Sequence, residues 1–411
     1  MTTFPKSQNN YKKLTNESEK LYKEQSLIPK RVSFQTLGCR LNQSESDILI
    51  RIFQLNGYKV VHSSQKADIY IINTCTVTSN SDTKNRNAIR AMNRKNPKAT
   101  IVVLGCYAQI NPEEISKIEG VNLILGNEDK VKILDYLKEI DSDQPPIIIR
   151  HKFNKNIFKS PIIPKLSDSD SKKEKGKNGN LLKVNPRKNN IIDYKQILAN
   201  SEKIEKTRSL LKIQDGCDFM CSFCVIPFAR GRSRYREFSN LQEEAKMLAE
   251  EEVREVVITG VNVGTYKTGN LNIVNVIDYL NSIKGIDRIR ISSIEPTTVP
   301  KILFEYMKDS QHKLVPFLHL PLQSGSNNIL KKMNRRYSVK DYSDEINSAF
   351  ESIPDLCIGT DVMVGFPEES EQDFEKTLNL LKNLPLTYFH VFPFSERRDQ
   401  DLSKTVSIMS I

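Results

Sequence analysis

The chain has 411 residues, of which 38% are hydrophobic and 27% charged, a composition typical of a globular protein with two or three domains. No apolar run reaches about 18 residues, and the start, MTTFPKSQNNYKKL, lacks the apolar core of a signal peptide, so we expect a cytoplasmic protein without a membrane segment. Seven cysteines, an odd number, argue against a disulfide framework there and favour metal-binding or catalytic thiols.

The net charge of +11 is concentrated in two polar segments. Residues 1–31 hold seven Lys/Arg against three Glu, and residues 151–206 hold fourteen Lys/Arg against six Asp/Glu, so the rest of the chain is close to neutral. Both segments have few apolar side chains with which to offset the entropy of ordering. We therefore interpret 1–30 as a flexible tail and 151–205 as a disordered basic linker or insert.

Between residues 31 and 150, apolar runs alternate with helical patterns such as NQSESDILIRIFQLNG. The predicted strands are VSFQTLG, ADIYIINT, TIVVLG and NLILG. Such alternation is typical of a parallel sheet with helices. Cys39, Cys75 and Cys106 each end one of these strands, where ligands of parallel sheets gather, so the three thiols could converge on one site. The alternative is that each is an ordinary buried cysteine.

The same alternation returns between residues 206 and 395. Its predicted strands are LLKIQDG, EVVITGVN, RIRISSIEP, FLHLPLQSG, CIGTDVMVGFP and YFHVFPFS. Six βα units indicate a partial barrel or a large open sheet. Cys357 opens one of these apolar runs without a partner, and we expect it in the core.

The stretch IQDGCDFMCSFCVIPFARG places Cys217, Cys221 and Cys224 in a C-x3-C-x2-C spacing directly after a predicted strand. Structural zinc takes four ligands, and none of the five histidines lies near these thiols in the sequence. A ferredoxin-type [4Fe-4S] cluster takes four thiolates. Three thiolates would leave one iron open to a ligand that brings its own amino and carboxylate groups.

The run ARGRSRYRE places arginines at every second position. An extended backbone would present them along one side, where they could follow phosphates, although a solvated charged edge is the alternative. These residues are Arg230, Arg232, Arg234 and Arg236. Arg335 and Arg336 in MNRRYS allow the same two interpretations.

Together with TLGCRLN, NTCTVT, LGCYAQ, ISSIEP, LPLQSGS and DVMVGFPEE, the cysteine motif resembles the methylthiotransferases of the radical S-adenosylmethionine superfamily. The resemblance covers roughly 31–150 and 208–395, and TLGCRLNQSE is most similar to the subgroup that modifies N6-threonylcarbamoyladenosine in tRNA. It implies an N-terminal parallel α/β cluster domain (31–150) followed by a partial (β/α)6 radical SAM barrel (206–395). It also implies transfer of a methylthio group to carbon 2 of that nucleoside, next to the anticodon, with an electron donor such as a flavodoxin or ferredoxin.

The resemblance further implies roles for particular residues. Cys217, Cys221 and Cys224 would hold a [4Fe-4S] cluster whose open iron binds S-adenosylmethionine, and Cys39, Cys75 and Cys106 would hold a second [4Fe-4S] cluster. A second S-adenosylmethionine would supply the methyl group. Cofactor contacts are expected from residues at strand ends of the barrel, namely Gly260, Glu295, Gln323 and Gly365.

Members of this family usually end in a small β-barrel that binds tRNA, and 396–411 is expected to be a tail without it. We therefore expect tRNA contacts from the arginine run and from the excess of eight positive charges in 151–206. Two alternatives stay open. One is a methylthiotransferase for isopentenyladenosine or for a ribosomal protein, and the other is a non-catalytic iron–sulfur protein that binds RNA.

Overall fold

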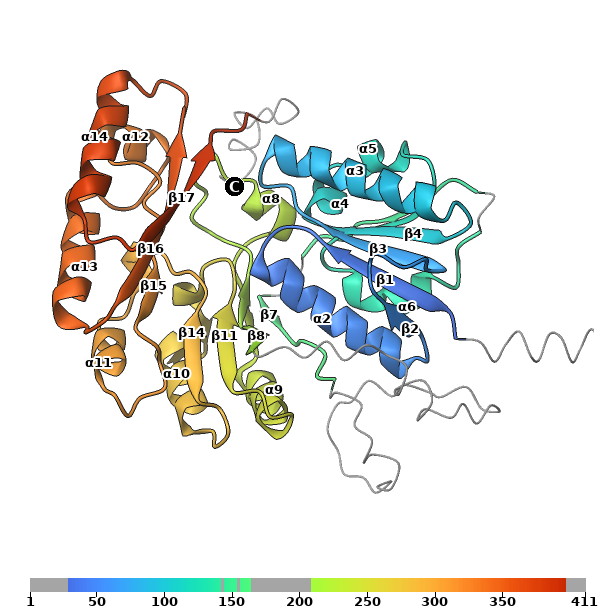
Figure 1. Cartoon of the computed structure of the whole chain (residues 1–411), viewed down its shortest axis with the longest axis horizontal. Coiled ribbons are helices and arrows are strands. Elements are labelled where there is room, and N and C mark those ends of the chain that lie inside the picture. The colour runs from blue at the N-terminus through green and yellow to red at the C-terminus, as the bar shows by residue number, and fades with distance from the viewer. Residues whose placement is uncertain (1–28, 142–143, 154–155, 164–207, 397–411) are drawn as a thin grey trace, which may run out of the picture.

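The computed structural model describes residues 29–141, 144–153, 156–163 and 208–396. Figure 1 shows two α/β halves side by side, an N-terminal half in blue and teal and a barrel half in yellow to red. The mixed α/β class and the order of the two halves predicted from the sequence are confirmed.

The N-terminal half contains one parallel sheet with the strand order β2-β1-β3-β4-β5-β6. Its strands are β1 (Arg31–Thr36), β2 (Lys59–Val61), β3 (Ile69–Thr74), β4 (Thr100–Gly105), β5 (Val121–Leu125) and β6 (Ile147–Ile149). The four apolar strands expected from the sequence are present, whereas β2 and β6 are short edge strands that the sequence pattern did not indicate.

Helices cover both faces of this sheet. They are α2 (Arg40–Leu55), α3 (Ser79–Lys95), α4 (Cys106–Ile110), α5 (Pro112–Ser116) and α6 (Ile133–Tyr136). Alternate residues of β4 supply the two cores: Ile101 and Val103 pack with the face of α3, and Val102 and Leu104 pack with the face of α2. A strand buried on both sides reads as a continuous apolar run, which explains the sequence TIVVLG.

The barrel half has six parallel strands in two ladders, β14-β11-β8 and β15-β16-β17. They are β8 (Arg208–Lys212), β11 (Glu255–Thr259), β14 (Arg288–Ile291), β15 (Phe317–His319), β16 (Cys357–Val364) and β17 (Tyr388–Pro393). A parallel bridge between Ile289 and Leu314 joins the ladders. Within the described residues β8 and β17 do not pair, so the barrel is partial, as predicted.

Amphipathic helices pack around the outside of these strands. They are α9 (Phe238–Glu250), α10 (Ile273–Ser282), α11 (Ile302–Lys308), α12 (Asn327–Lys332), α13 (Val339–Ser352) and α14 (Glu371–Asn383). Capping boxes at Asn272, Ser338 and Ser370 begin α10, α13 and α14, because a side-chain oxygen at each position satisfies a backbone N–H of the first turn. No helix among the described residues has both the length and the apolar character needed to span a bilayer.

Shorter elements lie in the connections between these strands and helices. They are β7 (Ile157–Phe158), β9 (Gln214–Asp215), α8 (Ile226–Arg230), β10 (Arg234–Arg236), β12 (Lys267–Thr268) and β13 (Leu271–Asn272). β7 pairs with β10, and the Ser160 backbone N–H donates to Asn240 over 2.9 Å. The expectation of a disordered linker is therefore wrong for residues 156–163.

Other expectations concern residues that the structure does not describe. The N-terminal tail up to residue 28, the basic segment 164–207 and residues 397–411 lie outside the described residues, so those interpretations stay predictions. Cys357, expected in the core, is the first residue of β16 and is only half-buried.

Candidate functional site

Three thiols lie at the carboxyl edge of the N-terminal sheet. Cys39 is the N-cap residue of α2 and follows β1, Cys75 follows β3, and Cys106 is the first residue of α4 and follows β4. β1, β3 and β4 are neighbours and run parallel, so their carboxyl ends lie together. β2 lies on one side of β1, whereas β3 and the later strands lie on the other side, so the strand order reverses between β1 and β3. Open α/β sheets bind their ligands at such a point.

Close packing around this triad requires glycine at two positions. Gly38 has φ +99°, and a Cβ there would lie 2.9 Å from the Cys75 Sγ, while Gly105 has φ +109° and its Cβ would lie 2.4 Å from the Thr74 carbonyl oxygen. Burial raises the pKa of the Cys75 thiol to about 11, and the thiols of Cys106 and Cys39 add to that rise.

We expect Gly105→Ala to destabilise this edge, because it adds both a steric clash and an unfavourable φ. Gly269→Ala is the matched control, since Gly269 also has positive φ but a Cβ there meets nothing within 4 Å. The control should lose about 1 kcal/mol and Gly105→Ala clearly more, as measured by urea unfolding. Equal losses would show that the contact with Thr74 is unimportant.

The second triad lies in the loop between β9 and α8. Gly216 has φ +70°, and a Cβ at this position would lie only 2.1 Å from the Arg232 carbonyl oxygen. The glycine therefore lets the loop pass close to that carbonyl. The Cys217 backbone N–H donates to Gly231 over 3.1 Å, and the Phe219 N–H donates to the Cys217 Sγ over 3.4 Å. These two backbone hydrogen bonds therefore help to fix the position of the first cysteine.

A distant segment, 333–338, packs against the same loop. Arg335, whose side chain is 4% exposed, donates to the Cys221 Sγ over 3.4 Å and to both Glu295 carboxylate oxygens over 2.6 and 2.7 Å. Arg336 lies 4.1 Å above the Phe219 ring. Neither contact has a sequence signal, because Arg335 and Cys221 are 114 residues apart.

Burial raises the pKa of all three thiols of this triad. It raises the pKa of Cys217 to about 11 and that of Cys224 to about 12, and it also raises the pKa of Cys221, where the Arg335 guanidinium opposes the rise. Bound iron would supply the positive charge that removes these protons.

The four residues expected to contact a cofactor follow four different strands at one end of the barrel. Gly260 follows β11, Glu295 comes after β14, Gln323 after β15 and Gly365 after β16. Gln323 has φ +71°, a conformation that is unfavourable for a non-glycine residue and is typical of functional sites. Their contact with a cofactor stays a prediction.

The two triads flank a single helix contact. α4 begins at Cys106, α8 begins two residues after Cys224, and these helices pack together between the halves (Figure 1). The Asn127 side-chain amide donates to the Ala229 carbonyl over 2.7 Å and lies 3.7 Å from the Cys106 Sγ.

An ion cluster lies at the same junction, formed by Glu45, Lys130, Lys212, Asp215 and Arg230. Arg230 contacts Glu45 at 2.9 Å and Asp215 at 3.1 Å, Lys212 contacts the same two carboxylates at 2.8 and 2.7 Å, and Lys130 also pairs with Glu45. Burial alone would raise the pKa of Glu45, but Arg230, Lys130 and Lys212 hold it well below its ordinary value.

The expected exposed arginine edge is wrong. Arg230 ends the helix α8 and its side chain is 1% exposed, Arg234 pairs with Glu128 and Asp215, and Arg236 is fully buried against Glu244. Because these three are neutralised inside the protein, they are not available to phosphates. Only Arg232, 50% exposed and 3.6 Å from Asp218, lies at the surface.

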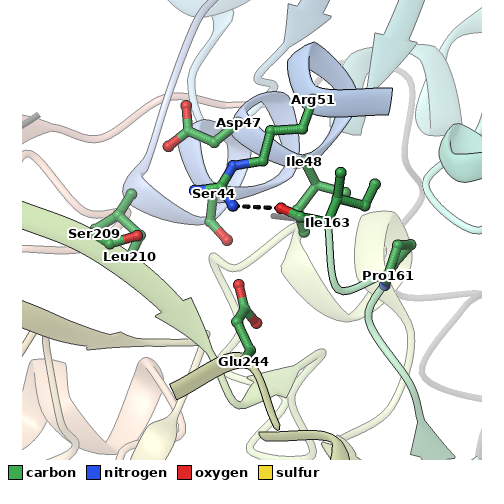
Figure 2. Close-up of a pocket in the computed structure, with 9 residues that line it drawn as sticks. All are labelled: Ser44, Asp47, Ile48, Arg51, Pro161, Ile163, Ser209, Leu210 and Glu244. Carbon is green, nitrogen blue, oxygen red and sulfur yellow. Dashed lines mark hydrogen bonds between the residues drawn. The ribbon is translucent and has the colours of Figure 1, made fainter. Parts of the chain in front are cut away.

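A small pocket lies where α2 meets the barrel (Figure 2). It is lined by Ser44, Asp47, Ile48, Arg51, Pro161, Ile163, Ser209, Leu210 and Glu244. Arg51 donates to the Ile163 carbonyl and pairs with Glu251 at 3.0 Å. No cysteine lines this pocket, so we interpret it as part of the packing between the halves.

Comparisons with known proteins agree with this geometry. The model of the uncharacterized protein family UPF0004 matches residues 31–126, and that of the radical SAM superfamily matches residues 211–381. The solved structure of a radical S-adenosylmethionine methyltransferase, TsrM from Kitasatospora setae, is similar over 89% of this chain and 75% of that chain, with a TM-score of 0.56 and 13% identity, which shows a shared fold. The fold is that of a radical SAM protein.

Relatives define the family more closely. The chain is 37% identical to a threonylcarbamoyladenosine tRNA methylthiotransferase of Aquifex aeolicus, over 91% of this chain and 82% of the relative, and 35% identical to that of Bacillus subtilis, over 89% and 74%. A tRNA-2-methylthio-N(6)-dimethylallyladenosine synthase of Thermodesulfovibrio yellowstonii is 32% identical over 89% of this chain and 76% of the relative. The chain belongs to the threonylcarbamoyladenosine tRNA methylthiotransferase family, as its motifs predicted.

Proposed function

We propose that this chain transfers a methylthio group to carbon 2 of N6-threonylcarbamoyladenosine in tRNA. The observation that carries the proposal is the pair of three-thiol sites on either side of the α4–α8 contact, one at the sheet edge and one at the barrel. Relatives that are 35–37% identical are named for this activity and supply the substrate.

The thiols fit the cofactors of this family, which are S-adenosylmethionine and [4Fe-4S] clusters. Thiolates are the usual ligands of such clusters, and three thiolates leave one iron for another ligand. We assign the first cluster to Cys217, Cys221 and Cys224, and the second to Cys39, Cys75 and Cys106. When bound, these cofactors supply the one-electron and sulfur chemistry of the reaction.

The residues of this chain position that chemistry. Arg335 donates toward the Cys221 sulfur and holds Glu295 at the strand end, so it can stabilise a thiolate there. Gly38, Gly105 and Gly216 let the backbone close around the thiols. Of the three thiols at the sheet edge, Cys75 and Cys106 are buried and Cys39 is exposed.

The acceptor tRNA follows from the family, whereas the electron donor is our proposal. A flavodoxin or ferredoxin would supply the electron, because the chemistry needs a reductant from outside the chain. The cytoplasmic location and the role of residues 151–206 in binding phosphates stay predictions.

An anaerobic reconstitution tests the proposal. We expect about eight iron atoms per chain, formation of 5′-deoxyadenosine after reduction, and a methylthio product from tRNA that carries threonylcarbamoyladenosine. About four iron atoms would contradict the two-cluster assignment. If only tRNA with isopentenyladenosine gave a methylthio product, the chain would instead have the activity named for the Thermodesulfovibrio relative. If no 5′-deoxyadenosine formed, a non-catalytic protein would be favoured.

A further inference from the structure

Two histidines and one aspartate that the proposed function does not use meet inside the barrel half. His319 is the last residue of β15, Asp361 lies in β16 and His390 in β17, and these strands are parallel neighbours (Figure 1). Leu318 and Ile358 belong to the hydrophobic core that also contains the outer helices. Because side chains alternate along a strand, His319 and Asp361 point to the opposite face, the inside of the barrel.

The polar atoms of these three side chains are close enough to share one metal ion. The Asp361 Oδ1 lies 3.1 Å from the His319 Nε2 and 3.1 Å from the His390 Nδ1, and the three side chains offer ligand atoms within 4.8 Å of one another. Imidazole nitrogens and carboxylate oxygens bind metals at about 2.0–2.2 Å, so two such ligands at right angles lie about 3 Å apart. The two short separations therefore fit neighbouring ligands of one ion.

A hydrogen bond from outside the triad orients His319. Its second ring nitrogen, Nδ1, lies 3.0 Å from the Tyr388 hydroxyl. Gly359 lies between them in the strand register, and a Cβ there would lie 2.1 Å from the Tyr388 ring, so the glycine lets this ring reach across β16. Metal-binding histidines commonly use their second nitrogen in this way, which fixes the ring orientation and the tautomer.

The Asp361 carboxylate has no permanently charged partner among the described residues. Its ion-pair partners there are the two histidines, and histidine, unlike arginine, is largely uncharged near neutral pH. Burial alone would raise the pKa of Asp361, but hydrogen bonds from His319 and His390 lower it below its ordinary value, so the carboxylate is ionised. Arg290 of β14 pairs with Glu255 over 2.9 Å instead. A carboxylate that is 24% exposed and faces imidazoles is therefore suited to receive a cation.

We propose that His319, Asp361 and His390 bind one divalent transition-metal ion of the class of Mn²⁺, Fe²⁺ or Zn²⁺. Two imidazoles with one carboxylate suit these ions and leave further coordination positions open. The side chain of His390 is 57% exposed and that of His319 9%, so the open positions face solvent on the side of His390. No cysteine belongs to this triad, and the inference goes beyond the proposed function and does not depend on it.

Mn²⁺ alone is the probe, because manganese prefers oxygen and nitrogen ligands to the thiolates that this chain also contains. Full-length protein with reconstituted clusters is titrated with Mn²⁺ under anaerobic conditions, and the free ion is quantified from its EPR signal. We expect one Mn²⁺ ion bound per chain. Electron spin echo spectra of the bound ion should show coupling to two imidazole nitrogens.

His390→Gln and Asp361→Asn should each weaken Mn²⁺ binding about tenfold or more. His390 is exposed in a strand at the end of its ladder, so its substitution should leave the unfolding midpoint unchanged, and any Mn²⁺ still bound should couple to one nitrogen only. Tyr388→Phe should weaken binding less and keep both couplings. His62→Gln is the matched control, since it removes an exposed histidine that contacts Ser64 in the N-terminal half, and it should bind Mn²⁺ as the wild type does.

Wild-type protein that takes up no Mn²⁺ at about tenfold excess would overturn the inference. Equal binding by the wild type and by folded His390→Gln protein, with the same nitrogen coupling, would overturn it too, because the ion would then lie elsewhere. Failure of the proposed function looks different: the reconstituted protein would form no methylthio product from tRNA, whereas its binding of Mn²⁺ and the effect of His390→Gln on that binding would remain.

Discussion

Cys221→Ala should abolish formation of 5′-deoxyadenosine, whereas Cys75→Ala should preserve it and lose methylthio transfer. Two thiolates cannot hold a site-differentiated [4Fe-4S] cluster, and the two cysteines belong to different triads on opposite sides of the α4–α8 contact. Each reconstituted variant should contain about four iron atoms per chain instead of about eight. 5′-Deoxyadenosine and the modified nucleoside would be quantified by mass spectrometry.

The equal iron contents make these two variants controls for each other. A general loss of folding would lower both activities and would be visible in the circular dichroism spectrum. If folded Cys75→Ala protein also stopped forming 5′-deoxyadenosine, the assignment of separate tasks to the two triads would be wrong.

Arg230→Met should lower the free energy of unfolding by about 3–5 kcal/mol. The substitution leaves Glu45 and Asp215 with less positive charge at a buried junction, where an uncompensated carboxylate is costly. Urea unfolding followed by circular dichroism measures the loss.

Arg232→Met is the matched control, two residues further along the same segment. Its side chain is half exposed and its ion pair with Asp218 is a surface pair, so it should change stability by less than about 1 kcal/mol. If the two variants were equally stable, the ion cluster at the junction would contribute little.

The arginine run shows where sequence reasoning fails in this protein. Spacing by two residues presents side chains on one side only if the backbone is extended, but α8 includes Arg230 and only 234–236 form a strand. The carboxylate of Glu45 that neutralises Arg230 lies 185 residues away in the chain. The sequence does not show which charged residues pair when they are far apart in the chain. Three of the four arginines expected to bind phosphates therefore proved to be buried in ion pairs.

The thiol positions were predictable for a different reason. Each of the N-terminal cysteines ends a strand, and strand ends of a parallel sheet meet by topology rather than by any particular side-chain contact. The six barrel strands were equally readable, since apolar runs and helical patterns alternate over short distances. The contact of Arg335 with Cys221 joins segments that are far apart in the sequence, so it could not be predicted.

The packing of 333–338 on the loop of Cys221 implies that the two thiol sites fold at different times during synthesis of the chain. All three thiols of the N-terminal triad and their strands have been made once residue 106 is synthesised, and the sheet around them ends at β6. The loop of Cys217 and Cys221 gains its partners Arg335 and Arg336 more than a hundred residues after its own synthesis. Since domains fold from the N-terminus as they emerge, we expect the sheet edge with its three thiols to fold before the loop of Cys217 and Cys221 gains these partners.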